Sequence, residues 1–290
     1  MSDCFDDRQT TDLACERRKA DLSLPGVAYA EETRGGLRWE RLRILSAEGE
    51  KSIGRPKGTY LTLTVPRMDG LDEGEKREIA QALADKLTDL SQNALGKLPE
   101  SLLVVGLGNE ALTPDAVGPL TARAVHATMH VKETDEAAFR AWDCAAIAVL
   151  TPGVTAQSGM DAAETVAAVC RKIKPDLVIA VDALAARATE RLGCTVQLSD
   201  TGISPGSGVG NHRIALNEKT VGAPVLAVGV PTVTDSRVFF AEEAERRGLS
   251  GEVDWTKAGM FVSPKEIGEI ADGAADLIGS AINTAFGVCL

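Results

Sequence analysis

The stretch Leu177-Val178-Ile179-Ala180-Val181-Asp182 is the most apolar strand-like segment of the chain. An uninterrupted run of aliphatic and β-branched residues is typical of a strand that is covered on both faces, as in a parallel sheet. Residues 102–107 form a second run of this kind, and residues 224–229 form a third. We expect these runs to be the core strands of one sheet.

Helical and strand-like patterns alternate around these core runs. Two strand-like segments lie in the first quarter of the chain, at residues 37–45 and 59–65. Residues 54–58, between them, have the composition of a turn. Helical spacing of apolar residues is found at residues 72–95, 160–173 and 264–286. A further helix is expected to begin near Thr113, with Pro114 in its first turn. The alternation predicts an α/β fold, a three-layer sandwich with a largely parallel central sheet.

The charge and composition exclude several classes of protein. The formal net charge of the 290 residues is −11, and such a surface repels a phosphate backbone, so we expect no direct nucleic-acid partner. No apolar run is long enough to span a bilayer, and the acidic N-terminal region has no signal-peptide core. We therefore expect a cytoplasmic protein with no membrane partner. Residues 1–36 lack periodicity, and we interpret them as a mobile leader.

The cysteines do not indicate a reactive or metal-binding site. The six cysteines are scattered, with no CxxC pair and no histidine at ligand spacing. We interpret Cys144, Cys170 and Cys194 as small structural residues, because a buried thiol without a basic partner is unreactive. The sequence accordingly predicts neither a metal nor a cofactor.

Two acidic residues follow the core strands. Asp182 ends an apolar run, where an unpaired buried carboxylate has a desolvation cost of several kcal/mol, and buried carboxylates cluster at functional sites. Asp115 is in the first turn of a helix, where the helix dipole alone favours an acidic residue. If the two strands are parallel neighbours, both carboxylates reach one crevice, where one can activate water and the other can protonate a leaving amine.

The glycine turns allow two interpretations. Gly106-x-Gly108 resembles the start of a dinucleotide-binding fingerprint, but Ala111 replaces its third glycine. The loop at residues 206–211 resembles a phosphate cradle but lacks the lysine of a P-loop. We favour a peptide cleft over a nucleotide site. Its lining candidates are Gly108, Asn109, Gly206, Ser207 and Gly208.

Several motifs of the chain resemble those of the germination protease family of spore-forming bacteria. They include residues 113–119 (TPDAVGP), 150–154 (LTPGV), 178–184 (VIAVDAL), 201–211 (TGISPGSGVGN) and 229–233 (GVPTV). The resemblance implies that Asp115 and Asp182 are the catalytic residues. It also implies a fold shared with hydrogenase maturation peptidases, which use a histidine and acidic residues to hold nickel. Ser204 stands where many relatives have histidine, so a metal-dependent maturation peptidase is the less favoured alternative, together with a non-enzymatic nucleotide-binding module.

The segment Thr11-Asp12-Leu13-Ala14-Cys15-Glu16 is similar to the site that germination proteases cut in their substrates. It departs from the pattern at Cys15, where serine is usual. The resemblance implies a zymogen that cuts itself between Asp12 and Leu13, with residues 1–12 as a propeptide and residues 13–290 as one peptidase domain. It also implies small acid-soluble spore proteins as substrates, a homotetramer, and a location in the forespore and spore core. For self-cleavage we expect residues 11–16 to be extended and mobile.

Overall fold

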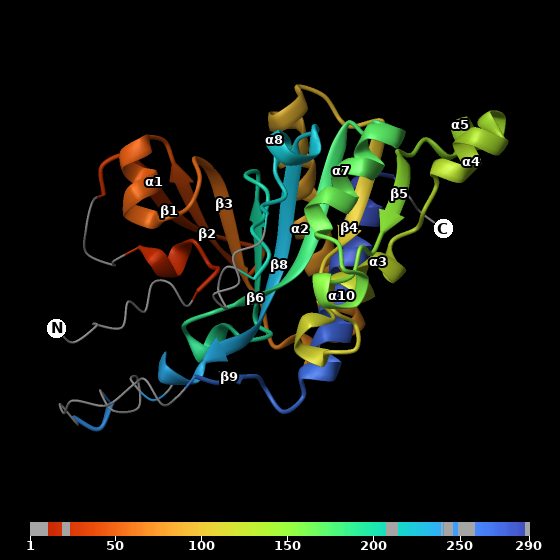
Figure 1. Cartoon of the computed structure of the whole chain (residues 1–290). Coiled ribbons are helices and arrows are strands. Elements are labelled where there is room, and N and C mark those ends of the chain that lie inside the picture. Colours follow the sequence, from red (N-terminus) through yellow and green to blue (C-terminus); the bar gives the residue numbers. More distant parts are fainter. Residues whose placement is uncertain are drawn as a thin grey trace.

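The computed structural model describes residues 11–18, 24–206, 214–238, 240, 246–248 and 259–287. The strands of the described ranges are β1 Val27–Arg34, β2 Leu37–Ile44, β3 Gly58–Thr64, β4 Ser101–Gly106, β5 Ala146–Leu150, β6 Leu177–Ala185, β7 Thr195–Ser199, β8 Val225–Asp235 and β9 Phe261–Val262. They form a mixed sheet in the order β1-β2-β3-β7-β8-β6-β4-β5, and β9 pairs with β8 (Figure 1).

The α-helices of these ranges are α1 Ala47–Ile53, α2 Glu73–Leu95, α3 Val117–Ala124, α4 Met129–Thr134, α5 Glu136–Trp142, α6 Thr155–Ser158, α7 Ala162–Ile173, α8 Glu218–Val221 and α10 Ile267–Ala285. Short 3-10 turns are η2 Cys15–Arg17, η3 Met68–Gly70, η4 Thr113–Asp115 and η5 Thr189–Arg191. No helix in the described part of the chain is long and apolar enough to cross a membrane.

Four strands form the parallel part of the sheet. β4 lies between β5 and β6, and β8 follows on the far side of β6; all three pairings are parallel. The core strands predicted at residues 102–107, 177–182 and 224–229 correspond to β4, β6 and β8, which confirms the α/β fold. The remaining strands pair antiparallel, from β8 through β7, β3 and β2 to β1.

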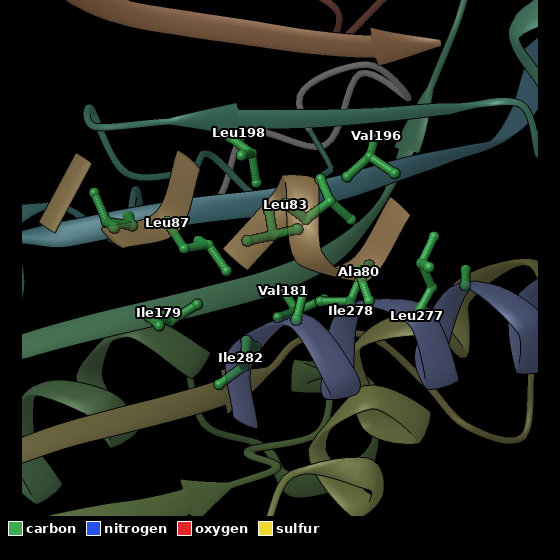
Figure 2. Close-up of a cluster of buried hydrophobic side chains, with 14 of the residues drawn as sticks. Ala80, Leu83, Leu87, Ile179, Val181, Val196, Leu198, Leu277, Ile278 and Ile282 are labelled. Carbon is green, nitrogen blue, oxygen red and sulfur yellow. The ribbon is translucent and has the colours of Figure 1, made fainter. Parts of the chain in front are cut away.

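Helices α2 and α10 cover one face of the sheet. Figure 2 shows their apolar side chains meeting those of β6 and β7: Leu83, Leu87, Ile278 and Ile282 from the helices and Ile179, Val181, Val196 and Leu198 from the strands. Each of these side chains is buried. Burial of one such side chain contributes about 1.5–3 kcal/mol. This large cluster fixes the sheet against the two helices.

The opposite face of the sheet packs against α7 and α8. Val166 and Cys170 of α7 lie in a second cluster with Val105 of β4 and Val178 of β6. Alternate residues of a strand point to opposite faces, which is why Ile179 and Val178 belong to different clusters. The two clusters together make the predicted three-layer sandwich.

The mobile leader predicted at residues 1–36 is wrong for the part that the structure describes. Residues 27–34 form β1, which pairs with β2 along its whole length. Residues 11–17 pack into the protein, with Thr11, Leu13 and Ala14 at 0% exposure. β1 carries three charged residues and faces solvent on much of its surface, so its sequence lacks the alternation that would have indicated a strand.

Candidate active site

A cavity of about 500 Å³ lies at the carboxyl ends of the parallel strands. In an α/β sheet this is the edge where ligands bind, because the loops that follow the strands converge there. Its lining residues come from the segments that follow β4 and β5, from the ends of β6 and β8, from β9, and from loop residues that include Asp12 and Gly206. Among its lining residues are Asp12, Gly108, Asp115, Asp182, Gly206, Thr232 and Phe261.

Asp182 enters the cavity from β6. It lies opposite Gly229 of β8, inside the strand rather than at its end, because β6 continues to Ala185. The residue is only 5% exposed, and its Oδ1 accepts a hydrogen bond of 3.0 Å from the backbone N–H of Ala183. This bond orients a carboxylate that is largely removed from bulk water.

Asp115 enters the same cavity from η4. The backbone N–H of Asn109 donates a 2.8 Å hydrogen bond to its Oδ2, and the Gln157 amide in turn donates one of 2.6 Å to the side-chain oxygen of Asn109. Gly108 has a φ of +112°, and a Cβ there would lie 2.1 Å from the backbone oxygen of Asp115. The protein's own backbone therefore fills the space next to Gly108, where a nucleotide-binding turn would admit a phosphate.

Two close contacts hold η4 and α3 against the sheet. A Cβ on Gly118, near the start of α3, would lie 2.1 Å from the carbonyl oxygen of Leu107 and 2.5 Å from that of Val181. The Oγ1 of Thr232 in β8 donates a 2.7 Å hydrogen bond to the carbonyl oxygen of Pro114. A residue without a Cβ at position 118 and a hydroxyl at position 232 thus help to bring Asp115 to the cavity beside Asp182.

The segment Thr11–Arg17 reaches the cavity through Asp12. The N–H of Asp12 donates to the carbonyl oxygen of Ala185 at 2.8 Å, and the N–H of Ala185 donates to Oδ2 of Asp12 at 3.0 Å. β4 pairs with β6 only as far as Val181, and Ala186 donates to Val233 in β8. Asp12 therefore pairs with the stretch of β6 beyond the end of β4.

The side chains of this segment are also held. Asp12 forms an ion pair with Arg55 at 3.0 Å, and Leu13 packs in an apolar cluster with Leu184 and Leu192. The peptide that was predicted to be extended and mobile is instead docked. Its apolar residues are the reason, because exposing Leu13 to water costs about 1.5–3 kcal/mol.

The structure brings together most of the residues predicted for the site. The cavity is lined by Asp12, Gly108, Asp115, Asp182 and Gly206. Asn109 contacts Asp115 through its N–H, and Leu13 packs in the apolar cluster beside Asp12. Ser207 and Gly208 lie outside the described residues.

The sequence did not indicate Arg55, Gln197 or Thr232 as parts of this region. Arg55 belongs to a segment that was interpreted as a turn, and Gln197 belongs to β7, which was not predicted. Thr232 was indicated only by its place in the GVPTV motif at residues 229–233. Each of these three side chains forms a hydrogen bond with a residue that is distant in the sequence.

The cysteines of the described part are buried or half-buried. Burial raises the pKa of Cys15 to about 12 and raises the pKa of Cys144, Cys170 and Cys194 above the ordinary thiol value. These thiols remain protonated at neutral pH, which supports a structural role. No group of three or more His, Cys, Asp or Glu side chains within the described ranges is placed to hold a metal ion.

Comparison with known proteins gives one consistent family. The model of the germination protease family matches residues 7–243. A germination protease from Caldanaerobacter subterraneus subsp. tengcongensis is 42% identical over 228 residues, which cover 78% of this chain and 69% of that protein. Another from Clostridium tetani is 35% identical over an alignment of 315 positions, which covers 95% of this chain and 94% of that protein.

A solved structure is also similar. The crystal structure of the NiFe hydrogenase maturation protease HycI from Thermococcus kodakarensis KOD1 matches with a TM-score of 0.37 and 21% sequence identity. The match covers 68% of this chain and 99% of the other.

Proposed function

The chain belongs to the germination protease family, and we propose that it is an aspartate-dependent endopeptidase made as a self-processing zymogen. It cuts after an acidic residue and before a hydrophobic one, and so begins the degradation of small acid-soluble spore proteins during germination. The observation that supports the proposal best is that Asp115, Asp182 and Asp12 line one cavity.

Two carboxylates in one cavity suit peptide hydrolysis without a covalent intermediate. One group, as the carboxylate, takes a proton from water as the water attacks the scissile carbonyl, and the other, as the protonated carboxyl, gives its proton to the leaving amine as the C–N bond breaks. The N–H groups of Asn109 and Ala183 keep Asp115 and Asp182 oriented while protons move.

The location of Asp12 supports cleavage within the same molecule. Asp12 lines the cavity, and Leu13 follows it directly in a buried apolar cluster. An intramolecular peptide that is already positioned requires no binding step, which favours its hydrolysis once the reacting groups align. Residues 1–12 are then the propeptide, and residues 13–290 are the peptidase domain.

The remaining parts of the proposal concern the setting of the enzyme. Its partners are the small acid-soluble proteins as substrates and further copies of itself in a homotetramer. It works in the cytoplasm of the forespore and in the spore core. It uses no cofactor, and it contacts neither nucleic acid nor membrane directly.

Incubation of the pure protein with a small acid-soluble spore protein tests this function. We expect the substrate to yield two fragments, with the cut after an acidic residue and before a hydrophobic one. Mass spectrometry of the enzyme itself should show release of residues 1–12 from the wild type and their retention in Asp115→Asn. Equal release from both proteins would assign the processing to another protease and contradict self-cleavage.

A further inference from the structure

The contacts of residues 11–16 have the character of peptide recognition. Arg55 donates to Oδ1 of Asp12 at 3.0 Å and to the carbonyl oxygen of Thr11 at 3.2 Å. The two charged side chains are only 14% and 11% exposed. A charge-assisted hydrogen bond that is shielded from water in this way discriminates strongly between a carboxylate and an amide.

A second acidic residue of the segment is held just as closely. Glu16 accepts hydrogen bonds from the N–H groups of Arg187 at 2.7 Å and Ala188 at 3.0 Å, and Arg191 lies 3.5 Å from its carboxylate. The Glu16 side chain is 4% exposed. Two converging N–H groups and a guanidinium make a site that fits a carboxylate.

Between these two carboxylate sites, the protein contacts the backbone of the segment and the apolar side chain of Leu13. The Gln197 amide accepts from the N–H of Ala14 at 2.8 Å and donates to the carbonyl oxygen of Asp12 at 3.3 Å. Leu13 packs against Leu184 and Leu192. Main-chain bonds combined with pockets for particular side chains are the usual means by which a groove selects a peptide.

We infer that the groove that holds residues 11–16 is the groove that receives substrates, and that Arg55 determines the specificity for an acidic residue before the cut. The carboxylate site formed by Arg187, Ala188 and Arg191 determines the preference for an acidic residue four positions further on. The inference rests on the proposed function, because it takes the Asp12–Leu13 bond as the scissile bond. The chain thus carries a bound copy of the peptide class that it recognises.

This arrangement requires an exchange in the groove. A cut between Asp12 and Leu13 separates the residue bound by Arg55 and Ala185 from the part that remains attached to the enzyme. The new N-terminus then lacks one of its two carboxylate anchors. An intact substrate has both anchors, so it competes favourably with the shortened segment.

The test uses synthetic peptides that contain the sequence TDLACE with neutral flanks. Three peptides are compared: the parent, one with Asn for the first acidic residue and one with Gln for the second. With the wild type we expect each substitution to lower kcat/KM at least about tenfold. In the enzyme variant Arg55→Gln, the kcat/KM of the Asn peptide should be nearly equal to that of the parent peptide. The kcat/KM of the Gln peptide should remain as far below that of the parent peptide as it is with the wild type.

Matched variants separate recognition from a general loss of charge. Lys57→Gln removes an exposed positive charge two residues away and should keep both preferences. Arg55→Lys retains the charge and should keep part of the preference for the acidic residue. Circular dichroism shows whether each variant is folded. An unchanged preference for Asp over Asn in folded Arg55→Gln would overturn the inference.

A binding readout distinguishes this inference from the proposed function. In the full chain, a peptide that enters the groove displaces residues 11–16 and exposes Cys15 to iodoacetamide. The parent peptide should speed alkylation of Cys15 in the wild type at least about tenfold more effectively than the Asn peptide, and Arg55→Gln should remove that difference. Displacement that depends on Arg55 without any cleavage would support the groove and refute the peptidase. Cleavage of the parent peptide without displacement would refute the groove alone.

Discussion

Thr232 of β8 donates a 2.7 Å hydrogen bond to the carbonyl oxygen of Pro114, the residue that precedes Asp115. Thr232 is 1% exposed, so water does not compete for this bond. The contact joins two segments that are 118 positions apart, and it fixes the short turn η4 against the central sheet. The position of Asp115 relative to Asp182 therefore depends on a residue of the strand next to β6.

The substitution Thr232→Val should reduce kcat by roughly tenfold to a hundredfold, because a displacement of about 1 Å at a reacting group can cost that much. The KM should change little, since Thr232 contacts the turn and not the docked peptide. Thr232→Ser keeps the hydroxyl and should retain most of the activity. A Val variant with normal kcat in steady-state kinetics would show that η4 is held adequately by its other contacts.

Asp115→Asn and Asp182→Asn should each lower the rate of peptide cleavage at least ~10²-fold, because each removes one member of the proposed acid–base pair. The fold should be preserved, since both substitutions conserve size and shape. Turnover of a peptide substrate and far-UV circular dichroism measure the two effects. Full activity in either folded variant would exclude that residue from the mechanism.

Gly118→Ala should destabilise the protein by more than about 2 kcal/mol, because the added methyl group meets two backbone oxygens that cannot move independently of the sheet. Gly268→Ala is the matched control. It also places alanine in a helix, but its nearest neighbour would be a Thr113 methyl group at 3.8 Å, an ordinary contact. The control should gain up to about 1 kcal/mol from helix propensity. Urea unfolding monitored by circular dichroism gives both values, and equal effects would contradict the packing described for Gly118.

Docking of residues 11–17 should weaken in alkaline solution. Burial raises the pKa of Cys15 from 9.0 to about 12, so the folded protein holds this proton more tightly than the unfolded chain does. The stabilisation is complete below pH 9.0 and is lost as the pH rises toward 12. Unfolding free energies measured between pH 8 and 11 should fall more steeply for the wild type than for Cys15→Ala. Parallel curves would mean that Cys15 is not the titrating group.

The parts of the fold that were predicted from sequence are those with a strong local signal. β4, β6 and β8 each contain a continuous run of apolar residues, and α2 has both helical spacing and a capping box formed by Asp72 and Glu75. β7 has only five residues, with threonine and glutamine among them, and its burial arises from its neighbours β3 and β8. Its polar and apolar residues alternate as in a strand, but over only five residues, and this short pattern was not interpreted as a strand.

The site shows the same division. Asp115 and Asp182 could be predicted as a pair because parallel strands bring their carboxyl ends to one edge of the sheet. The docking of Asp12 could not, because it depends on Arg55 and Ala185, which are 43 and 173 positions away. The charged residues around Leu13 indicated a solvated leader, whereas Asp12 and Glu16 have charged partners elsewhere in the fold.

Strand β6 carries both Asp182 and Ala185, so the distance between the acid and the residue that pairs with the docked peptide is fixed within one strand. Three residues of extended chain span about 10 Å. Both positions pair with β8, Asp182 with Gly229 and Ala185 with Val233, and the register shifts by one residue of β8 just before Ala185. The distance from the acid to the point where the peptide attaches is consequently set by covalent geometry and by the sheet, and loop motion does not alter it. The loops around the cavity can vary without changing this distance, whereas a single residue inserted between the two positions would lengthen it by about 3.3 Å and move the docked peptide away from the acid.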